Sequence, residues 1–243
     1  MKKRCKFLSS IFENILLPYE VSKKYEEEII GEFENSIEKG YFHKFISFLD
    51  GESIILDLAC GDGRHTLKLS EHFKHVVAVD LSYNQLKLAK RKCLRRENIS
   101  FIRASMFNLP FSQNIFDGIW FSQAFEYIPP DMRKLFISSI YNILKPRGTL
   151  YMSVETWMYP NLLDTLRRFL GDLKLFLYWK FIRRKPLIWG EFLYRISIEN
   201  VSIPHYHVHI DKWTLCKILD KNGFTIKEID LYDGYIYVLC RKT

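Results

Sequence analysis

The sequence is poor in cysteine, and its few cysteines are not arranged for metal or disulfide chemistry. They are scattered along the chain without a CxxC pair: Cys5, Cys60, Cys93, Cys216 and Cys240. This pattern argues against a zinc knuckle and against a disulfide framework, and it favours a reducing, cytoplasmic setting. No uninterrupted apolar stretch follows the basic N-terminus, so we expect no secretory signal.

Acidic residues are also in short supply. The chain has 28 Asp and Glu against 36 Lys and Arg, which gives a formal net charge of +8. This balance favours anionic partners, among them nucleic acid and acidic lipid surfaces, although basic soluble proteins are common. Hydrophobic content of 48% and charged content of 26% predict a soluble globular protein with an ample core.

The stretch from Ile54 to Arg64 carries the clearest chemical signal. A short apolar run ends in small residues and an amphipathic segment follows, which predicts a buried parallel strand, a tight turn and a helix. Gly61 and Gly63 let the backbone approach a ligand closely, beside the N–H groups of the helix start. Thr66 stands where a dinucleotide-binding motif has its third glycine, which argues against a nicotinamide-dependent oxidoreductase.

A second buried strand is predicted over residues 76–80, and it ends in Asp80. A carboxylate at this place can accept hydrogen bonds from both hydroxyls of a ribose. The alternative role for Asp80 is a helix N-cap, which Ser82 can fill instead. The glycine turn and this acid together predict a ribose-binding site.

In the order and spacing of its motifs, the chain resembles the class I S-adenosylmethionine (SAM) dependent methyltransferases from about residue 50 to 155. The matching segments are 56–66, 79–82, 108–111, 116–120 and 144–150. The resemblance implies an α/β fold, namely a three-layer sandwich around a mostly parallel sheet with a C-terminal antiparallel hairpin. It also implies SAM as the cofactor, but it specifies no acceptor.

The resemblance assigns roles to individual positions. Asp57 would organise the methionine end of SAM, and Ser122 and Gln123 would face the methyl group. Many family members have an acid that accepts from the adenine amino group, where this chain has Ser105, so a hydroxyl or backbone group would substitute. The whole implied cofactor-binding set is Asp57, Ala59, Cys60, Gly61, Gly63, Asp80, Leu81, Ser105, Met106, Ser122 and Gln123.

Candidate catalytic residues follow the fourth predicted strand, 115–121. Ligands of open α/β sheets bind at the carboxyl ends of the strands, so Glu126 and Tyr127 lie where an acceptor approaches. Family members often have a histidine in place of Tyr127, and we expect no strong base there. Glu126 is either a hydrogen-bonding group of the site or a solvent-facing residue. The next helix is predicted to start at a cap formed by Asp131.

Three histidines alternate along residues 204–209. In an extended strand, the side chains of His205, His207 and His209 project to one face. We expect no metal site, because no acid or cysteine stands at matching spacing. His207 is the candidate general base, because an imidazole titrates near neutral pH. The alternative is that these histidines have no chemical role.

The predicted domain organisation is an N-terminal helical cover, 1–50, and a SAM-binding α/β domain, 51–243, with a helical insertion at 156–204. Leucines and aromatic residues repeat at helical spacing over 162–185, with Lys and Arg among them. Charges interrupt this run too early for a transmembrane span, which needs ~20 mostly apolar residues. Three interpretations stay open: a lid over the active site, a helix that contacts an anionic membrane surface, or a subunit contact.

The sequence therefore predicts a cytoplasmic SAM-dependent methyltransferase that acts on an O, N or C nucleophile of a small, partly apolar acceptor. RNA, such as tRNA, is an alternative acceptor, since the predicted helix 83–96 is densely basic, although no aromatic residues interleave with its charges. A SAM-binding regulatory or partner subunit without catalysis is a further alternative, which the departures at Ser105 and Tyr127 keep open.

Overall fold

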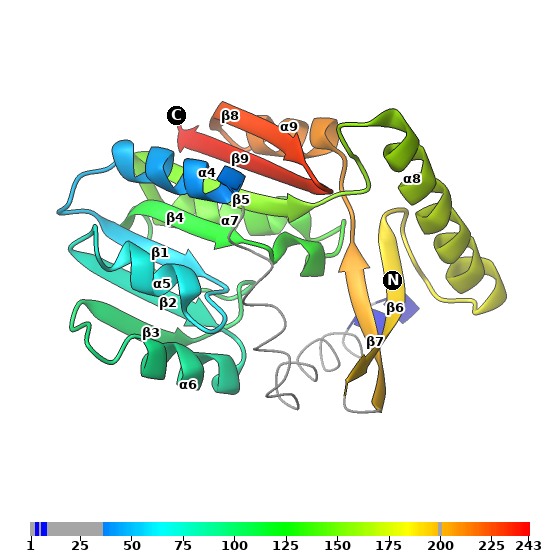
Figure 1. Ribbon diagram of the computed structural model, residues 1–243, viewed down its shortest axis with the longest axis horizontal. Helices are drawn as coiled ribbons and strands as arrows, with labels where there is room; N and C mark the ends of the chain where they lie inside the picture. The colour runs from blue at the N-terminus through cyan, green and yellow to red at the C-terminus, as the bar shows by residue number, and fades with distance from the viewer. Residues whose placement is uncertain (1–2, 5, 9–35, 199–200) are drawn as a thin grey trace.

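The structure is a computed structural model, and it describes residues 3–4, 6–8, 36–198 and 201–243. At its centre lies a seven-stranded sheet with the order β3-β2-β1-β4-β5-β9-β8 (Figure 1). Strands β1 to β5 pair in parallel, and β9 pairs antiparallel with both β5 and β8, which confirms the predicted fold class. The strands are β1 (Ile54–Leu58), β2 (His75–Asp80), β3 (Ile99–Arg103), β4 (Phe116–Ser122), β5 (Leu144–Glu155), β8 (Phe224–Tyr232) and β9 (Tyr235–Lys242).

Helices cover both faces of this sheet (Figure 1). Successive residues of β1 divide between two cores, because side chains alternate across a strand. The helices on one face are α4 (Ser36–Ser47), α5 (Arg64–Leu69) and α6 (Tyr83–Lys92), and those on the other face are α7 (Arg133–Ile143) and α9 (Lys212–Lys221). Ile55 of β1 packs with Phe45 of α4, whereas Leu56 packs with Phe136 of α7 on the opposite face. Most of the predicted N-terminal cover, residues 9–35, lies outside the described residues.

The helix α7 starts at Arg133 with Met132 as its N-cap, one residue later than predicted, and Asp131 does not cap it. Instead Asp131 binds the guanidinium of Arg4, which also contacts the buried carboxylate of Glu191 at 2.8 Å. The phenol of Tyr206 donates to the same carboxylate at 2.6 Å. An ion pair over 127 residues of sequence is invisible to local patterns, so the cap prediction failed for lack of tertiary information.

The insertion after β5 is only partly helical. It contains α8 (Leu162–Leu177) and one π-helical turn, η2 (Tyr178–Ile182), and then the antiparallel strands β6 (Glu191–Ile198) and β7 (Val201–Val208). The helical prediction for 156–204 is therefore wrong beyond η2. Residues 192–198 are rich in aromatic and β-branched side chains, which favour a strand once a partner strand is available. Across the described ranges, no helix is both long and apolar enough to span a membrane.

Candidate functional site

The turn after β1 has the shape that a closely bound cofactor requires. Its backbone is left-handed at Ala59 (φ 57°), Gly61 (φ 53°) and Gly63 (φ 81°). A Cβ atom on Gly63 would stand 2.8 Å from the Cβ of Ala89 in α6, so the turn packs on that helix only because glycine is there. The turn also directs the N–H of Gly61 to the carboxylate of Asp80, at 2.9 Å.

Asp80 ends β2 at the same edge of the sheet and is held rigidly. One carboxylate oxygen accepts from Gly61, and the other accepts from the N–H of Ser82 at 2.8 Å. Ser82, not Asp80, is the N-cap of α6, since its hydroxyl accepts from the N–H of Gln85. Each carboxylate oxygen can accept more than one hydrogen bond, so Asp80 stays suited to the hydroxyls of a ribose.

Asp57 lies at the end of β1 and is 2% exposed. Burial raises its pKa to about 6, against the opposing effects of the charge on His65 and the hydrogen bond from Thr66. The hydroxyl of Thr66 donates to Asp57 at 2.5 Å. This contact explains why a threonine replaces the third glycine of the dinucleotide motif: the position supports a buried acid instead of packing a helix on a strand.

Four further cofactor-binding candidates lie in or near this turn. The thiol of Cys60 is buried, and burial keeps its pKa well above the ordinary value, so it stays neutral. Leu81 is exposed directly after Asp80. After β3, the hydroxyl of Ser105 accepts from the N–H of Phe107 at 3.3 Å, and Met106 packs partly on the core. Because β3 is next to β2, these residues lie at the same edge of the sheet as Asp80.

Ser122 is the last residue of β4 and Gln123 follows it, and both bind to side chains that sequence patterns did not indicate. The hydroxyl of Ser122 donates to Glu38 at 2.7 Å and lies 2.9 Å from the hydroxyl of Ser153. Gln123 has a left-handed backbone (φ 51°), and its N–H donates to the hydroxyl of Ser153 at 3.1 Å. The predicted methyl-facing residues are therefore fixed from behind by α4 and β5.

Glu38 is the residue of this region that sequence reasoning missed. It is buried, and its carboxylate lies 3.7 Å from both the guanidinium of Arg64 and the imidazole of His65. Burial disfavours the charge, but the neighbouring His65 and Arg64 and the hydrogen bond from Ser122 bring its pKa below the ordinary value. The only sequence signal was a lone acid on the apolar side of a predicted helix.

Glu126 and Tyr127 lie on a short 3-10 turn, η1 (Phe125–Tyr127), just beyond β4. Glu126 is buried, which excludes the solvent-facing alternative. Burial, and then repulsion by Glu155, raise its pKa to about 8. Among the described residues, its Oε2 atom has no hydrogen-bond partner. A pKa of about 8 keeps Glu126 mostly in its neutral form at pH 7.

Glu155, at the end of β5, joins the histidines into one polar cluster. Its two oxygens lie 2.7 Å from Nδ1 of His207 and 3.2 Å from Nε2 of His209. The other ring nitrogen of His209 lies 2.6 Å from the buried carboxylate of Asp172 in α8. Burial disfavours the charged forms of Glu155 and His209. The hydrogen bonds of this cluster outweigh that effect, so the pKa of Glu155 lies below its ordinary value and the pKa of His209 lies above its own. The predicted common face of the three histidines thus exists, with an acid that the spacing did not indicate.

His205 completes the cluster and defines the proton positions. Its Nε2 lies 2.8 Å from Nε2 of His207, so one of the two nitrogens donates to the other. Burial, more than the neighbouring His207, lowers the pKa of His205 to about 4, so it is neutral. We assign the proton to Nε2 of His205, because its Nδ1 is buried with no partner in the described chain. His207 then donates from Nδ1 to Glu155 and carries its lone pair on Nε2. The ring of Tyr127 lies edge-on to both histidines, with centroids 5.7 and 5.4 Å away.

Glu155, His207 and His209 have the ligand types of a metal site, with donor atoms within 4.8 Å of one another. A cation already lies among them. The guanidinium of Arg168 is 3.2 Å from Oε1 of Glu155 and 3.1 Å from Nε2 of His209. A metal ion would have to displace this group, so we assign the cluster to hydrogen bonding and proton chemistry.

The chain resembles known proteins in both sequence and fold. Residues 55–148 match the family described as "Methyltransferase domain". A ubiquinone/menaquinone biosynthesis C-methyltransferase of Wigglesworthia glossinidia brevipalpis is 28% identical over 194 residues, which are 77% of this chain and 72% of that protein. A demethylmenaquinone methyltransferase of Lactococcus lactis is 32% identical over 156 residues, 55% of this chain and 60% of the relative. One of Staphylococcus saprophyticus is 33% identical over 98 residues, 39% of this chain and 41% of the relative.

Solved structures agree on the fold. The structure of DhpI with S-adenosylhomocysteine (SAH) has a TM-score of 0.70 at 18% identity, over 96% of this chain and 97% of that chain. The Burkholderia thailandensis 1,6-didemethyltoxoflavin N1-methyltransferase, with its acceptor and SAH bound, has a TM-score of 0.62 at 17% identity, over 99% and 87%. With the strand order, the glycine turn and the acid after β2, these matches identify a SAM-dependent methyltransferase domain, whose methyl donor is SAM, over residues 55–148.

Proposed function

We propose that this methyltransferase acts on a small, partly apolar acceptor with an acidic proton, such as a hydroxylated aromatic ring, and that His207 takes up this proton. The observation that carries the proposal is the pair of His207 and Glu155, 2.7 Å apart beside Tyr127 at the carboxyl end of the sheet. The named acceptors of the relatives, demethylmenaquinone and a didemethyltoxoflavin, are small ring compounds, which supports the acceptor class.

On the cofactor side, the chain has to bind and orient a group that is already activated. The sulfonium of SAM supplies the methyl group, so in-line positioning and exclusion of water provide much of the rate. We propose that Asp80 holds the ribose and that the Ala59–Gly63 backbone lines the methionine part. Ser122 and Gln123, fixed by their hydrogen bonds to Glu38 and Ser153, would define the methyl-facing wall.

On the acceptor side, we propose that His207 and Glu155 work as a pair. A hydroxyl that replaces His205 as the partner of Nε2 can pass its proton to His207. The carboxylate of Glu155, already in contact with Nδ1, then stabilises the imidazolium. Glu126, neutral and buried, can donate a hydrogen bond to an acceptor oxygen, and the Tyr127 ring forms an apolar wall beside it.

The test is methyl transfer from labelled SAM to a panel of hydroxylated aromatic and quinol acceptors. His207→Gln should lower kcat by about 10²–10⁴-fold, the usual contribution of a general base. The matched control is His43→Gln, because His43 is exposed on α4 and lies outside the cluster. A His207→Gln enzyme with unchanged kcat and an unchanged pH profile would overturn the assignment of the base.

RNA is a second candidate acceptor, and one surface feature favours it. A groove of ≈ 400 Å³ runs along α6, lined by Tyr83, Lys87, Lys90, Phe101 and Arg103 among others. Aromatic rings beside cations are what single-stranded nucleic acid uses for binding. RNA affinity that falls steeply with salt and is lost in Lys87→Glu/Lys90→Glu would support this candidate. Weak binding that does not respond to these changes would exclude it.

A further inference from the structure

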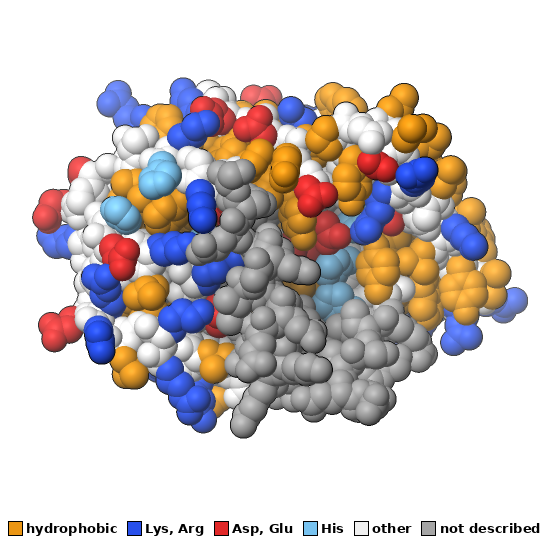
Figure 2. Space-filling view, in the orientation of Figure 1, with side chains coloured by type: hydrophobic (Ala, Val, Ile, Leu, Met, Phe, Trp, Pro, Cys, Tyr) orange, Lys and Arg blue, Asp and Glu red, His pale blue; other side chains and the backbone are white. Residues whose placement is uncertain are grey.

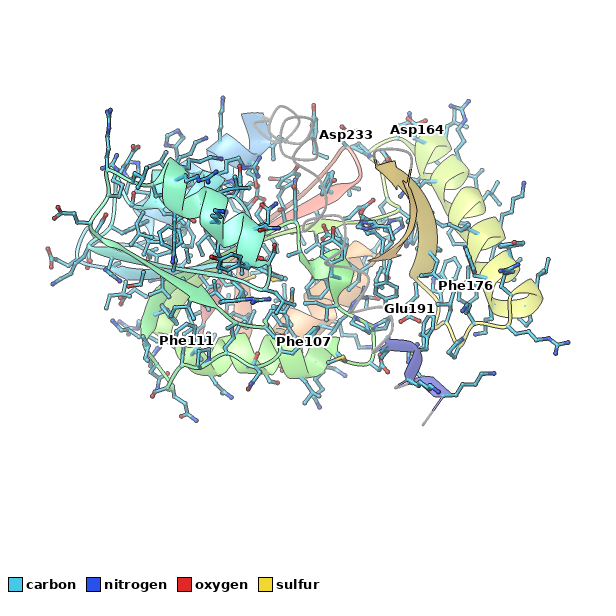
Figure 3. The ribbon with its side chains drawn as sticks, turned by 90° about the horizontal axis from the view of Figure 1, so that it is seen from below. Phe107, Phe111, Asp164, Phe176, Glu191 and Asp233 are labelled. Atoms are coloured by element: carbon cyan, nitrogen blue, oxygen red, sulfur yellow. The ribbon has the colours of Figure 1, made fainter. Side chains whose placement is uncertain are left out.

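Helix α8 has two faces with different surroundings. Its inner face carries Arg168 and Asp172 into the histidine cluster and packs Phe176 against Leu187 and Phe192. Figure 3 shows Phe176 between α8 and the strand that carries Glu191. Its outer face is apolar but faces solvent. Leu163, Leu166, Leu170 and Leu177 are between 44% and 66% exposed, and η2 adds Phe181 and Ile182 at 65% and 71%.

This outer face is unusual for a surface helix. Exposed leucines that are scattered singly are normal, whereas a continuous apolar stripe marks an interaction site. Leu163, Leu166, Leu170 and Leu177 follow helical spacing, so they form one stripe along the helix. In Figure 2 hydrophobic side chains gather on the side of the molecule where Figure 1 places α8.

The segment that carries the stripe has many basic residues and few acidic ones. Residues 162–190 contain seven Lys and Arg but only two acids, and one of the acids, Asp172, is buried. Asp164, which is partly buried, is thus the one acid of this segment with access to solvent. The exposed cations are Arg167, Lys174, Arg183, Arg184 and Lys185. Exposed Tyr178 and Trp189 stand near them in sequence and have the amphipathic rings that favour a boundary between water and apolar material.

A second copy of the chain does not fit this charge pattern. A symmetric dimer places the same patch on both sides of the interface, so the cations would face one another with few acids to pair them. Anionic headgroups supply the missing charge, and acyl chains supply an apolar environment. An apolar stripe with aromatic rings and flanking Lys and Arg is the composition of a helix that lies in a membrane interface.

We propose that α8 and η2 form a docking surface for an anionic lipid bilayer, with the leucine stripe at the acyl boundary and the flanking cations at the headgroups. The inner face of the same helix holds Arg168 and Asp172, so docking would bring the histidine cluster close to the membrane surface. Apolar acceptors partition into that region. The proposal stands on the outer face of α8 and does not depend on which acceptor is methylated.

The test is co-sedimentation of the full chain with vesicles of equal parts phosphatidylglycerol and phosphatidylcholine, compared with pure phosphatidylcholine. We expect strong binding to the anionic vesicles, reduced about tenfold or more by Leu166→Asp/Leu170→Asp. The matched control is Leu94→Asp/Leu135→Asp, which changes two leucines of comparable or greater exposure, 80% and 70%, on other elements. This control should bind like the wild type. Circular dichroism of each variant checks that it is folded.

A second pair of variants separates a docking surface from general charge attraction. Reversal of Arg183, Arg184 and Lys185 to Glu should abolish binding, whereas reversal of Lys87, Lys90 and Arg91 on α6 should weaken it little. Equal losses from both reversals, or no binding of the wild type to anionic vesicles, would overturn the proposal. Light scattering gives a further check. If the wild type is a dimer and Leu166→Asp/Leu170→Asp is a monomer, a second copy of the chain occupies the stripe and the proposal is overturned.

Discussion

Glu126 should make the protein less stable as pH rises, and Glu126→Gln should remove this effect. The folded-state pKa is about 8 and the ordinary value is 4.5. The unfolded chain therefore releases this proton first, and the wild type loses stability between these two pH values. A difference of about 3.5 pKa units at 1.36 kcal/mol each corresponds to about 4–5 kcal/mol when complete.

The assay is urea unfolding of the wild type and Glu126→Gln at pH 5 and at pH 9. At pH 5 both side chains are neutral in the folded protein, so most of the difference there comes from effects of the substitution that do not involve charge. Between pH 5 and pH 9 the variant should gain about 4 kcal/mol relative to the wild type. Glu97→Gln, at an exposed acid, is the control and should show no comparable gain. A constant difference between Glu126→Gln and wild type would refute the conclusion that Glu126 is buried and neutral.

Two further predictions concern the turn and the histidine cluster. Gly63→Ala combines strain at φ 81° with a clash on α6, so we expect weaker SAH binding by calorimetry and a loss of about 1–3 kcal/mol in unfolding free energy. Gly171→Ala, where the added Cβ has open space inside α8, should instead stabilise by up to ~1 kcal/mol. Asp172→Asn removes a buried partner of His209, whose raised pKa contributes stability at low pH that is lost as pH rises through the folded-state pKa. The variant should be less stable than wild type by urea unfolding at pH 6, with the difference shrinking by pH 9, and a pH-independent difference would contradict this reasoning.

The parts of the fold that local sequence could predict are those with local causes. The strand, turn and helix around Gly61 and Gly63 are set by residues within a dozen positions of one another, and so is the acid that ends β2. The parallel sheet follows from buried strands that alternate with amphipathic helices. These are the regions where prediction and structure agree.

The acceptor side depends on contacts between distant segments. Glu155 meets His207 across 52 residues, and Asp172 meets His209 across 37, so spacing alone could not join them. The sequence did not reveal the hairpin of β6 and β7, because a short run of aromatic residues is compatible with either a helix or a strand. Only the pairing with another strand decides between the two. The basic helix α6 likewise gains the ring of Phe101 from β3, which the sequence of the helix alone does not reveal.

The most direct test of the account is calorimetric titration of the protein with SAH, the demethylated product of the cofactor. We expect micromolar binding that Asp80→Ala weakens sharply, because we propose that Asp80 holds the ribose. Asp62→Ala is the control, since this acid of the same turn pairs with Lys92 instead. Binding that Asp80→Ala leaves undiminished would contradict the ribose-binding role of Asp80, and no binding at millimolar SAH would contradict the cofactor site itself.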